Sequence, residues 1–360
     1  MTRIFTSLKS VQTSTSGIDL KGGLTWDNIR TRIATDDQYK KDLESSRVVF
    51  NWEGGLTIGN KTFDLTGHAL SQLLSRFTPS AVRYFKRLLS DGTVTSYALA
   101  RRCINYGIDS YVEPSRGGRK ELLFRTRQLP NGKNIVRSVL TDRYQILDNH
   151  EILGGIVSKM SASMTPARLV ISDTGFELMV IDRLLTEEVA KDDRNYIANF
   201  YKNSETGNGS FGYIIGVFRA LCLNGMSLPV STHGFRVSHV SKSDMNGAIE
   251  DGIYQSFVKA PSIFAKLKES TQIELPRQLV NPTIQMVSLD GKWTSEFESQ
   301  VKAKAVTENP TKYGIIQAIT HSAKSLSDEK FVETEAFAGK LLFSDFSHYI
   351  KQASQALPVG

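Results

Sequence analysis

The residues best suited to chemistry in this chain form a dense run of basic side chains. Between residues 83 and 143, thirteen Lys and Arg stand against five Asp and Glu, so this segment carries a formal charge of +8 and the remainder sums to −1. Most of the thirteen are arginine, whose planar guanidinium binds phosphate oxygens in pairs and stacks on bases. The segment therefore predicts a surface for polyanions, with these candidate phosphate contacts: Arg83, Lys86, Arg87, Arg101, Arg102, Arg125, Arg127, Arg137 and Arg143.

Aromatic side chains are interleaved with this charge. Tyr84, Tyr111 and Tyr144 are candidates for stacking on bases, whereas Phe85 and Phe124 are expected in the core. Neutralised phosphates combined with stacked bases, worth ~1–3 kcal/mol per base, are typical of sequence-tolerant binding to single strands. We therefore expect single-stranded nucleic acid as the partner. The competing interpretation is that the charges are scattered over a solvated surface.

Carboxylates that could hold a catalytic metal occur in one short stretch. Asp142, Asp148 and Glu151 lie close together in sequence, and a metal-dependent nuclease needs such groups. A further pair, Asp173 and Glu177, flanks a predicted turn. Asp and Glu also gather at turns and helix starts, where they cap backbone amides. We interpret both groups as structural, and nuclease activity stays an alternative.

Other catalytic or cofactor motifs are missing from the sequence. His233 and His239 have no third ligand nearby, so no metal site is predicted. The stretch Gly207-Asn208-Gly209 lacks the Lys-Ser/Thr pair of a P-loop, and we expect residues 203–210 to form a hairpin loop, with anion contact through backbone amides as an alternative. No G-x-S-x-G nucleophile motif occurs. The sequence favours a binding protein over an enzyme, without a cofactor.

The totals agree with a folded, soluble, cytoplasmic protein. The net charge is +7, 40% of the residues are hydrophobic, and no apolar run is long enough for a membrane-spanning helix. The first residues lack the apolar region of a secretory signal. Cys103 and Cys222 stand alone among apolar neighbours, so we expect two buried, reduced side chains.

Two predicted elements would position the basic residues. Thr78 and Pro79 read as the start of a helix over residues 81–89, where Arg83 and Arg87 share one face. Residues 121–140 carry the clearest hairpin signal, an Asn-Gly turn between two β-prone runs, and alternation places Arg125 and Arg127 on one side. The helix and the hairpin together could form a basic groove.

The remaining pattern predicts short strands and helices. Strands are expected within 48–63 and at 167–171, 176–181, 195–201, 211–223 and 235–240. Helices are expected at 66–77, from 148, at 244–271 with an interruption at Pro261, and at 313–323 and 328–342, whereas 278–310 is ambiguous. Residues 211–223 also fit a helix, and their Tyr, Ile, Val and Phe content favours a strand.

These elements predict an α+β fold with a central antiparallel sheet of hairpins, packed helices and a helical C-terminal part. Three parts are expected along the chain. They are a polar, weakly ordered arm over 1–42 with one short helix at 26–35, an α+β core domain over 43–275, and a mainly helical part over 276–360 with a peripheral tail after Phe346.

Several strings, taken in order, resemble the YafZ/YfjQ-like family of phage and plasmid proteins. They are VFNWEGGLTI at 49–58, LTGHALSQLL at 65–74, RSVLTDRYQILDN at 137–149, NSETG at 203–207, RALCLNGM at 219–226 and YGIIQAITH at 313–321. The resemblance runs from about residue 45 to residue 342, and Met226 and the stretch 233–239 match only loosely. It implies a mobile-element context and offers no catalytic residue.

The combined hypothesis is a phage- or plasmid-type protein that binds and anneals single-stranded DNA in recombination, as a homo-oligomer and without catalysis. The annealing role rests on analogy with the basic, oligomeric annealing proteins of phages. One alternative is an interaction protein that inhibits a host defence or restriction system. The second is the metal-dependent nuclease.

Overall fold

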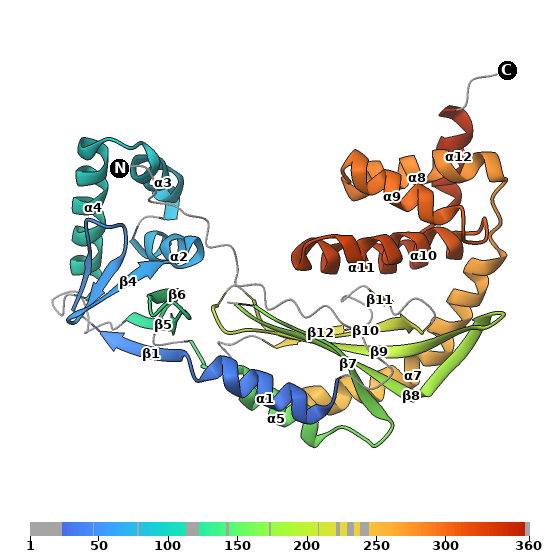
Figure 1. Ribbon diagram of the computed structural model, residues 1–360, viewed down its shortest axis with the longest axis horizontal. Coiled ribbons are helices and arrows are strands. Elements are labelled where there is room, and N and C mark those ends of the chain that lie inside the picture. The colour runs from blue at the N-terminus through green and yellow to red at the C-terminus, as the bar shows by residue number, and fades with distance from the viewer. Residues whose placement is uncertain are drawn as a thin grey trace.

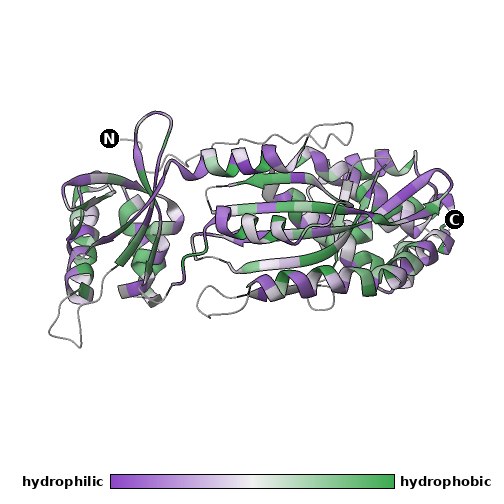
Figure 2. Ribbon diagram, turned by 90° about the horizontal axis from the view of Figure 1, so that it is seen from below, coloured by the Kyte–Doolittle hydropathy of each residue, from purple (hydrophilic) through white to green (hydrophobic). Residues whose placement is uncertain are grey.

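The computed structural model describes residues 24–45, 47–77, 79–112, 122–141, 144–172, 174–207, 209–220, 224–228, 234–237 and 245–356. Two β-sheets lie side by side along the long axis of the molecule, and each is covered by its own helices (Figure 1). Hydrophobic residues concentrate on the strands of both sheets, while hydrophilic residues are more frequent on outer helix faces and loops (Figure 2). This burial pattern gives each sheet its own core.

The first sheet, here called the N-terminal sheet, has six strands. Their spatial order is β1 (Lys40–Ser45), β5 (Leu122–Gln128), β6 (Asn134–Thr141), β4 (Lys61–Leu65), β3 (Leu56–Ile58) and β2 (Val48–Phe50). All pairs are antiparallel except β4 with β6. The predicted Asn131-Gly132 hairpin is confirmed, and Gly132 adopts a positive φ of 79° that favours glycine.

Three helices cover this sheet: α2 (Gly67–Phe77), α3 (Val82–Ser90) and α4 (Val94–Val112). The predicted start of α2 is confirmed, because the hydroxyl of Thr66 accepts a hydrogen bond from the Ala69 amide at 3.0 Å. Leu70 and Leu73 of α2 and Ile104 of α4 are buried in the core of the N-terminal sheet. A short 3₁₀ turn over Pro79–Ala81 precedes α3.

The second sheet, here called the central sheet, is antiparallel throughout. Its long strands are β7 (Met164–Ile171), β8 (Gly175–Ala190), β9 (Asp193–Ser204) and β10 (Phe211–Arg219). Two short strands share the free edge of β10, with β11 (Asn224–Ser227) on residues 216–219 and β12 (Gly234–Val237) on residues 211–214. Residues 211–219 are thus a strand, as their β-branched and aromatic content predicts.

Helices cover both faces of the central sheet (Figure 1). One face carries α1 (Trp26–Asp37), α5 (Asn149–Ser158) and the long α7 (Met245–Gln272). The opposite face carries α10 (Lys312–Ser322) and α11 (Asp328–Phe343), next to α8 (Arg277–Gly291), α9 (Ser295–Ala305) and α12 (Ser347–Ala356). Among the described helices, none combines the length and apolarity needed to cross a membrane.

The predicted α+β class, hairpin-built antiparallel strands and helical C-terminal part are confirmed. Three details differ from the expectation. The strands form two sheets rather than one. Helix α7 continues through Pro261, because buried residues on both sides of the proline, such as Ala260 and Ile263, hold it on the sheet. Cys103 is exposed on α4 rather than buried, and Cys222 lies outside the described residues.

The ends of the chain also differ in part from the expectation. Residues 1–23 of the predicted arm lie outside the described residues, whereas 24–42 form α1 and the start of β1. Ile29 and Ile33 of α1 are buried in the core of the central sheet. The ambiguous stretch 278–310 forms α8 and α9, and the tail after Phe346 forms α12, whose Ala353 is buried.

Two helical glycines give a matched test of the packing between α11 and β11. A Cβ added to Gly339 would lie 1.9 Å from the carbonyl oxygen of Ser227, whereas a Cβ on Gly154 of α5 meets nothing within 4 Å. We predict that Gly339→Ala lowers the free energy of unfolding by roughly 1–3 kcal/mol through overpacking. Gly154→Ala should raise it by up to about 1 kcal/mol through helix propensity. Chemical denaturation measures both, and equal effects would contradict the close approach.

Candidate functional site

The structure separates the predicted phosphate contacts into two groups. Arg83, Lys86, Arg87 and Arg102 are exposed on α3 and α4, and Arg101 is half-buried beside them. The hairpin arginines Arg125, Arg127 and Arg137 instead point toward the junction of the two sheets and lie among carboxylates. Arg143 lies outside the described residues.

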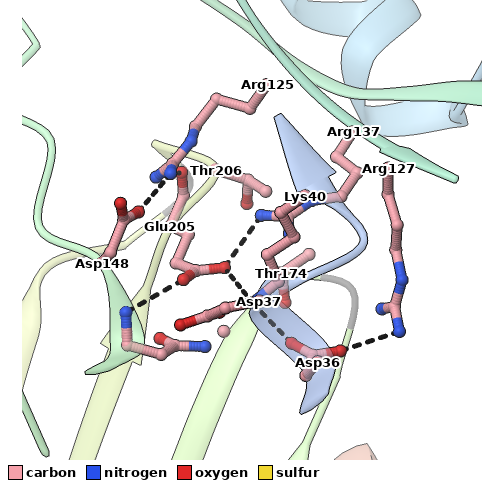
Figure 3. Close-up of polar contacts among 12 residues, drawn as sticks. Asp36, Asp37, Lys40, Arg125, Arg127, Arg137, Asp148, Thr174, Glu205 and Thr206 are labelled. Atoms are coloured by element: carbon pink, nitrogen blue, oxygen red, sulfur yellow. Dashed lines mark hydrogen bonds and ion pairs between the residues drawn. The ribbon is translucent and has the colours of Figure 1, made fainter. Parts of the chain in front are cut away.

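The carboxylate of Glu205 lies at the centre of this junction (Figure 3). Its side chain is 0% exposed, and it pairs with Lys40 Nζ and with Arg137 Nη2, each at 2.9 Å. The Asn149 amide donates to the other carboxylate oxygen at 3.0 Å. Arg125 donates to the Glu205 backbone carbonyl at 3.0 Å. We call these residues, together with Asp36, Asp37, Asp42, Arg127 and Asp148, the Glu205 cluster.

Further ion pairs extend the Glu205 cluster to α1 and β1. Lys40 pairs with Asp36 at 2.5 Å and with Asp37 at 2.8 Å, and Arg127 pairs with Asp36 at 2.7 Å. Arg125 pairs with Asp148 and, at 3.0 Å, with Asp42. Every charge that enters the junction is thus matched by at least one opposite charge, as burial of ions requires.

A β-bulge sets the direction of Arg137. The pairing of β5 with β6 shifts between Arg125 and Thr126, which leaves Arg137 without a directly paired residue on β5. A bulge of this kind turns a side chain away from the regular alternation. Arg137 can therefore reach Glu205 on the same side as Arg125 and Arg127.

The loop after β9 carries Glu205 into the junction. The Glu205 amide donates to the Thr174 carbonyl at 2.7 Å, and the Thr206 carbonyl accepts a hydrogen bond from Gln72 of α2 at 2.7 Å. Gly207 has a φ of 72°, and a Cβ there would lie 2.5 Å from a methyl carbon of Leu140. The glycine in this loop is therefore explained by close docking against the N-terminal sheet.

Burial and charge compete in the pKa values of the Glu205 cluster. Burial raises the pKa of Glu205, but the charges of Lys40 and Arg137 outweigh it and hold the pKa below its ordinary value. Burial by itself would lower the pKa of Lys40. The negative charges of Glu205 and Asp36 outweigh burial, so the pKa lies above its ordinary value. For Arg137 burial prevails over the charge of Glu205 and lowers the pKa, and the like charge of Arg125 adds to the lowering. Its Nε and Nη1 have no hydrogen-bond partner among the described residues.

These contacts correct part of the sequence prediction. Arg125 and Arg137 are 3% and 2% exposed, so their guanidinium groups are not accessible to a phosphate. Both instead form ion pairs within the junction. Tyr144 donates its hydroxyl to the Ser204 carbonyl at 3.1 Å, and burial raises its pKa to about 12. Its hydroxyl therefore supports the Glu205 loop, and the side chain is half-buried.

The carboxylates of the nuclease alternative and the two neighbouring histidines lie only partly within the described residues. Asp148 is engaged by Arg125, while Asp142, Asp173, His233 and His239 lie outside the described residues. No group of three or more His, Cys, Asp or Glu among the described residues is arranged to hold a metal ion.

A groove between α2, α3 and α4 retains the other basic residues. Its volume is about 770 Å³, and its lining includes Arg76, Arg102, Phe85, Tyr106 and Tyr111. Tyr106 is 70% exposed at the groove, and Tyr84 of α3 is 55% exposed. The groove thus combines guanidinium groups, apolar walls and accessible aromatic rings.

An aromatic stack lies elsewhere on α4. The Arg101 guanidinium lies 4.6 Å from the centre of the Trp52 ring, and Trp52 stacks on Tyr97 at 5.8 Å. The Arg101 Nε also donates to the Phe50 carbonyl at 3.1 Å. Arg101 therefore takes part in the packing around Phe50 and Trp52, while Trp52 is 53% exposed.

Comparisons with known proteins place the chain in a family. The family profile described as Domain of unknown function (DUF932) matches residues 136–332, more than half of the 360 residues. The chain belongs to the DUF932 family. The match includes Arg137, Asp148 and Glu205 and leaves out α2, α3 and α4. No curated protein and no solved structure matches the chain.

Glu205 gives a direct test of the junction. We predict that Glu205→Gln lowers the free energy of unfolding by roughly 3–5 kcal/mol, because the buried Arg137 loses its carboxylate partner and Lys40 keeps only Asp36 and Asp37. Glu269→Gln is the matched control, since Glu269 forms an exposed pair with Lys266 and its loss should be without measurable effect. Urea denaturation compares the two, and equal stabilities would contradict the central role of Glu205.

The lowered pKa of Glu205 also predicts a dependence on acid. The unfolded chain binds a proton on this residue near the ordinary value of 4.5, while the folded protein binds it only at lower pH. The pair contribution is therefore complete above pH 4.5 and is lost as the pH falls through the folded pKa. Denaturation at neutral pH and below pH 4.5 should show a smaller acid-induced loss for Glu205→Gln than for the parent protein. Parallel losses would overturn the assignment.

Proposed function

We propose that the protein binds single-stranded nucleic acid in the groove between α2, α3 and α4, without performing chemistry. The observation that carries the proposal is the groove itself, where Arg76, Arg102 and the exposed Tyr106 line one space of about 770 Å³. Single-strand binding needs cations along a backbone path and ring faces for bases, and the groove offers both.

Charge on this face favours a polyanion. Residues 76–112 contain six Lys and Arg against two Asp. One of these acids, Asp91, accepts hydrogen bonds from Thr93 and Ser96, which help hold its pKa below the ordinary value. Arg83, Lys86 and Arg87 extend the positive charge from the groove along α3.

The resemblance to YafZ/YfjQ-like proteins of phages and plasmids supplies the biological part of the proposal. It supports a role in recombination, with annealing of complementary single strands in the cytoplasm of a bacterial host. The groove lies outside the DUF932 match, so this proposal concerns the portion of the chain that precedes it.

A second candidate is an interaction protein that binds a component of a host defence system. It is favoured by the apolar part of the same groove, where Leu99 is 47% exposed and Leu74 and Ile104 form part of the lining. A partner protein could bury this surface. Binding of short single strands by the purified protein distinguishes the two functions, since a protein-only site would leave them unbound.

The test is a fluorescence-anisotropy titration of labelled single strands at several salt concentrations. We predict that Arg102→Ala weakens binding and reduces the dependence on salt, because one phosphate contact is lost, with a slope change of about 1. Tyr106→Ala should weaken binding by ~1–3 kcal/mol with the salt dependence unchanged, because a stacking contact is lost.

Arg194→Ala is the matched control, because Arg194 is an exposed arginine of β9. It should bind like the parent protein. Absence of salt-sensitive binding at micromolar protein would reject the proposed function, and equal weakening by Arg102→Ala and Arg194→Ala would reject the groove as its site.

A further inference from the structure

Helix α7 exposes a second regular set of residues on the side away from the central sheet. The set is spaced alternately by three and four residues, and every member is exposed: Asp251, Tyr254, Val258, Pro261, Ala265 and Lys268. We call it the α7 seam. Its Tyr254 and Val258 are 63% and 54% exposed, and the neighbouring Phe257 is 43% exposed. Alternating three and four spacing is the pattern by which two helices pack along each other.

We propose that the α7 seam binds the same seam of a second copy of this chain, with the two helices antiparallel. This inference is independent of the proposed nucleic-acid site, since α7 covers the central sheet and contributes no residue to the groove between α2, α3 and α4. A two-fold axis requires that the same patch complements itself. The seam meets this requirement in shape and in charge.

Shape complementarity follows from the order of residues. In an antiparallel pair centred between positions 258 and 261, Tyr254 of one copy faces Ala265 of the other, and Val258 faces Pro261. A large ring thus lies against a small side chain at both ends of the apolar stretch. Alternation of large and small residues is what dense packing between helices needs.

Charge complementarity follows from the two halves of α7. Residues 245–258 contain two acidic residues and no Lys or Arg, while residues 259–272 contain three Lys and one Glu. The same antiparallel register places Asp251 opposite Lys268 at both ends of the seam. A parallel pair would instead set like charges side by side, which disfavours it.

The ion pair that Lys268 forms within the chain does not prevent it from pairing with Asp251 of a second copy. Lys268 pairs with Glu187 of β8 at 2.6 Å, and both side chains are about half exposed. Exposed pairs of this kind contribute little stability, so Lys268 can move to the carboxylate of a second copy at small cost.

The size of the seam determines the strength of the contact. The stretch from Asp251 to Lys268 spans about 26 Å at 1.5 Å per residue, which is short for a stable interface of ~800 Å² per partner. The dimer should therefore be reversible and dependent on concentration. Sedimentation equilibrium of the full chain over the micromolar to sub-millimolar range is the direct measurement.

Val258→Lys tests the apolar centre of the seam. It should raise the dimer dissociation constant about tenfold or more, because two charges would meet near the axis. Leu289→Lys is the matched control, since Leu289 is a 69% exposed apolar residue of α8 outside the seam. A parent protein that stays monomeric throughout, or a dimer equally insensitive to both variants, would overturn the proposal.

A charge exchange tests the register. Asp251→Lys alone should raise the dissociation constant about fivefold or more, because it opposes Lys268 twice. Combining it with Lys268→Glu should restore dimerisation toward the parent level, whereas additive weakening would overturn the antiparallel register. Circular dichroism of each variant confirms that the exposed changes leave the fold intact.

Engineered cysteines give a positional readout in a background with both natural cysteines replaced, Cys103→Ser and Cys222→Ser. A mixture of Tyr254→Cys chains and Ala265→Cys chains should form an intermolecular disulfide upon mild oxidation, while either variant alone should not. Cross-linking of Tyr254→Cys to itself would indicate parallel helices and overturn the proposal.

Discussion

Burial of the Glu205 carboxylate between two sheets is the constraint on which the arrangement of this molecule depends. A lone carboxylate in that position would be strongly destabilising, so the surrounding chain must deliver cations to it. Lys40 arrives on the edge strand of the N-terminal sheet and Arg137 on a bulged strand of the same sheet, while Glu205 comes from the central sheet. Electrostatic pairing across the junction therefore specifies how the two sheets lie against each other.

The same requirement explains why the arginines of this chain have two separate roles. Arginines of the hairpin lie on strands whose other face packs into a core, and their guanidinium groups are used within the junction. Basic residues of α3 occupy the outer face of an amphipathic helix and stay accessible to solvent. The basic stretch of the sequence therefore divides into the hairpin arginines, which are paired inside the protein, and the basic residues of α3, which lie on the surface.

Sequence patterns predicted the parts of the fold that depend on neighbouring residues. The Asn-Gly hairpin, the Thr66 cap and the strand at 211–219 follow from local rules, and all three are present. Alternation also placed Arg125 and Arg127 correctly on one side of β5.

The Glu205 cluster could not be predicted in this way. Glu205 is 165 positions from Lys40 and 68 from Arg137, and it lies in a polar, glycine-containing loop that is typical of exposed surface. The one feature of the sequence that could have pointed to the cluster is an acidic residue, Glu205, next to the glycines of this loop. The continuation of α7 through Pro261 escaped prediction for a similar reason, because tertiary contacts overrode a local helix breaker.

The path of the chain has a consequence for the order of folding. Helix α1 packs on α5 and β7 in the central sheet, whereas β1, which follows it directly, belongs to the N-terminal sheet. The whole stretch from β1 to β6 is therefore an insertion between α1 and its packing partners. During synthesis α1 is made before the inserted stretch, and its packing partners α5 and β7 follow only after that stretch is complete. The apolar face of α1 therefore stays unpaired while the inserted sheet can already form.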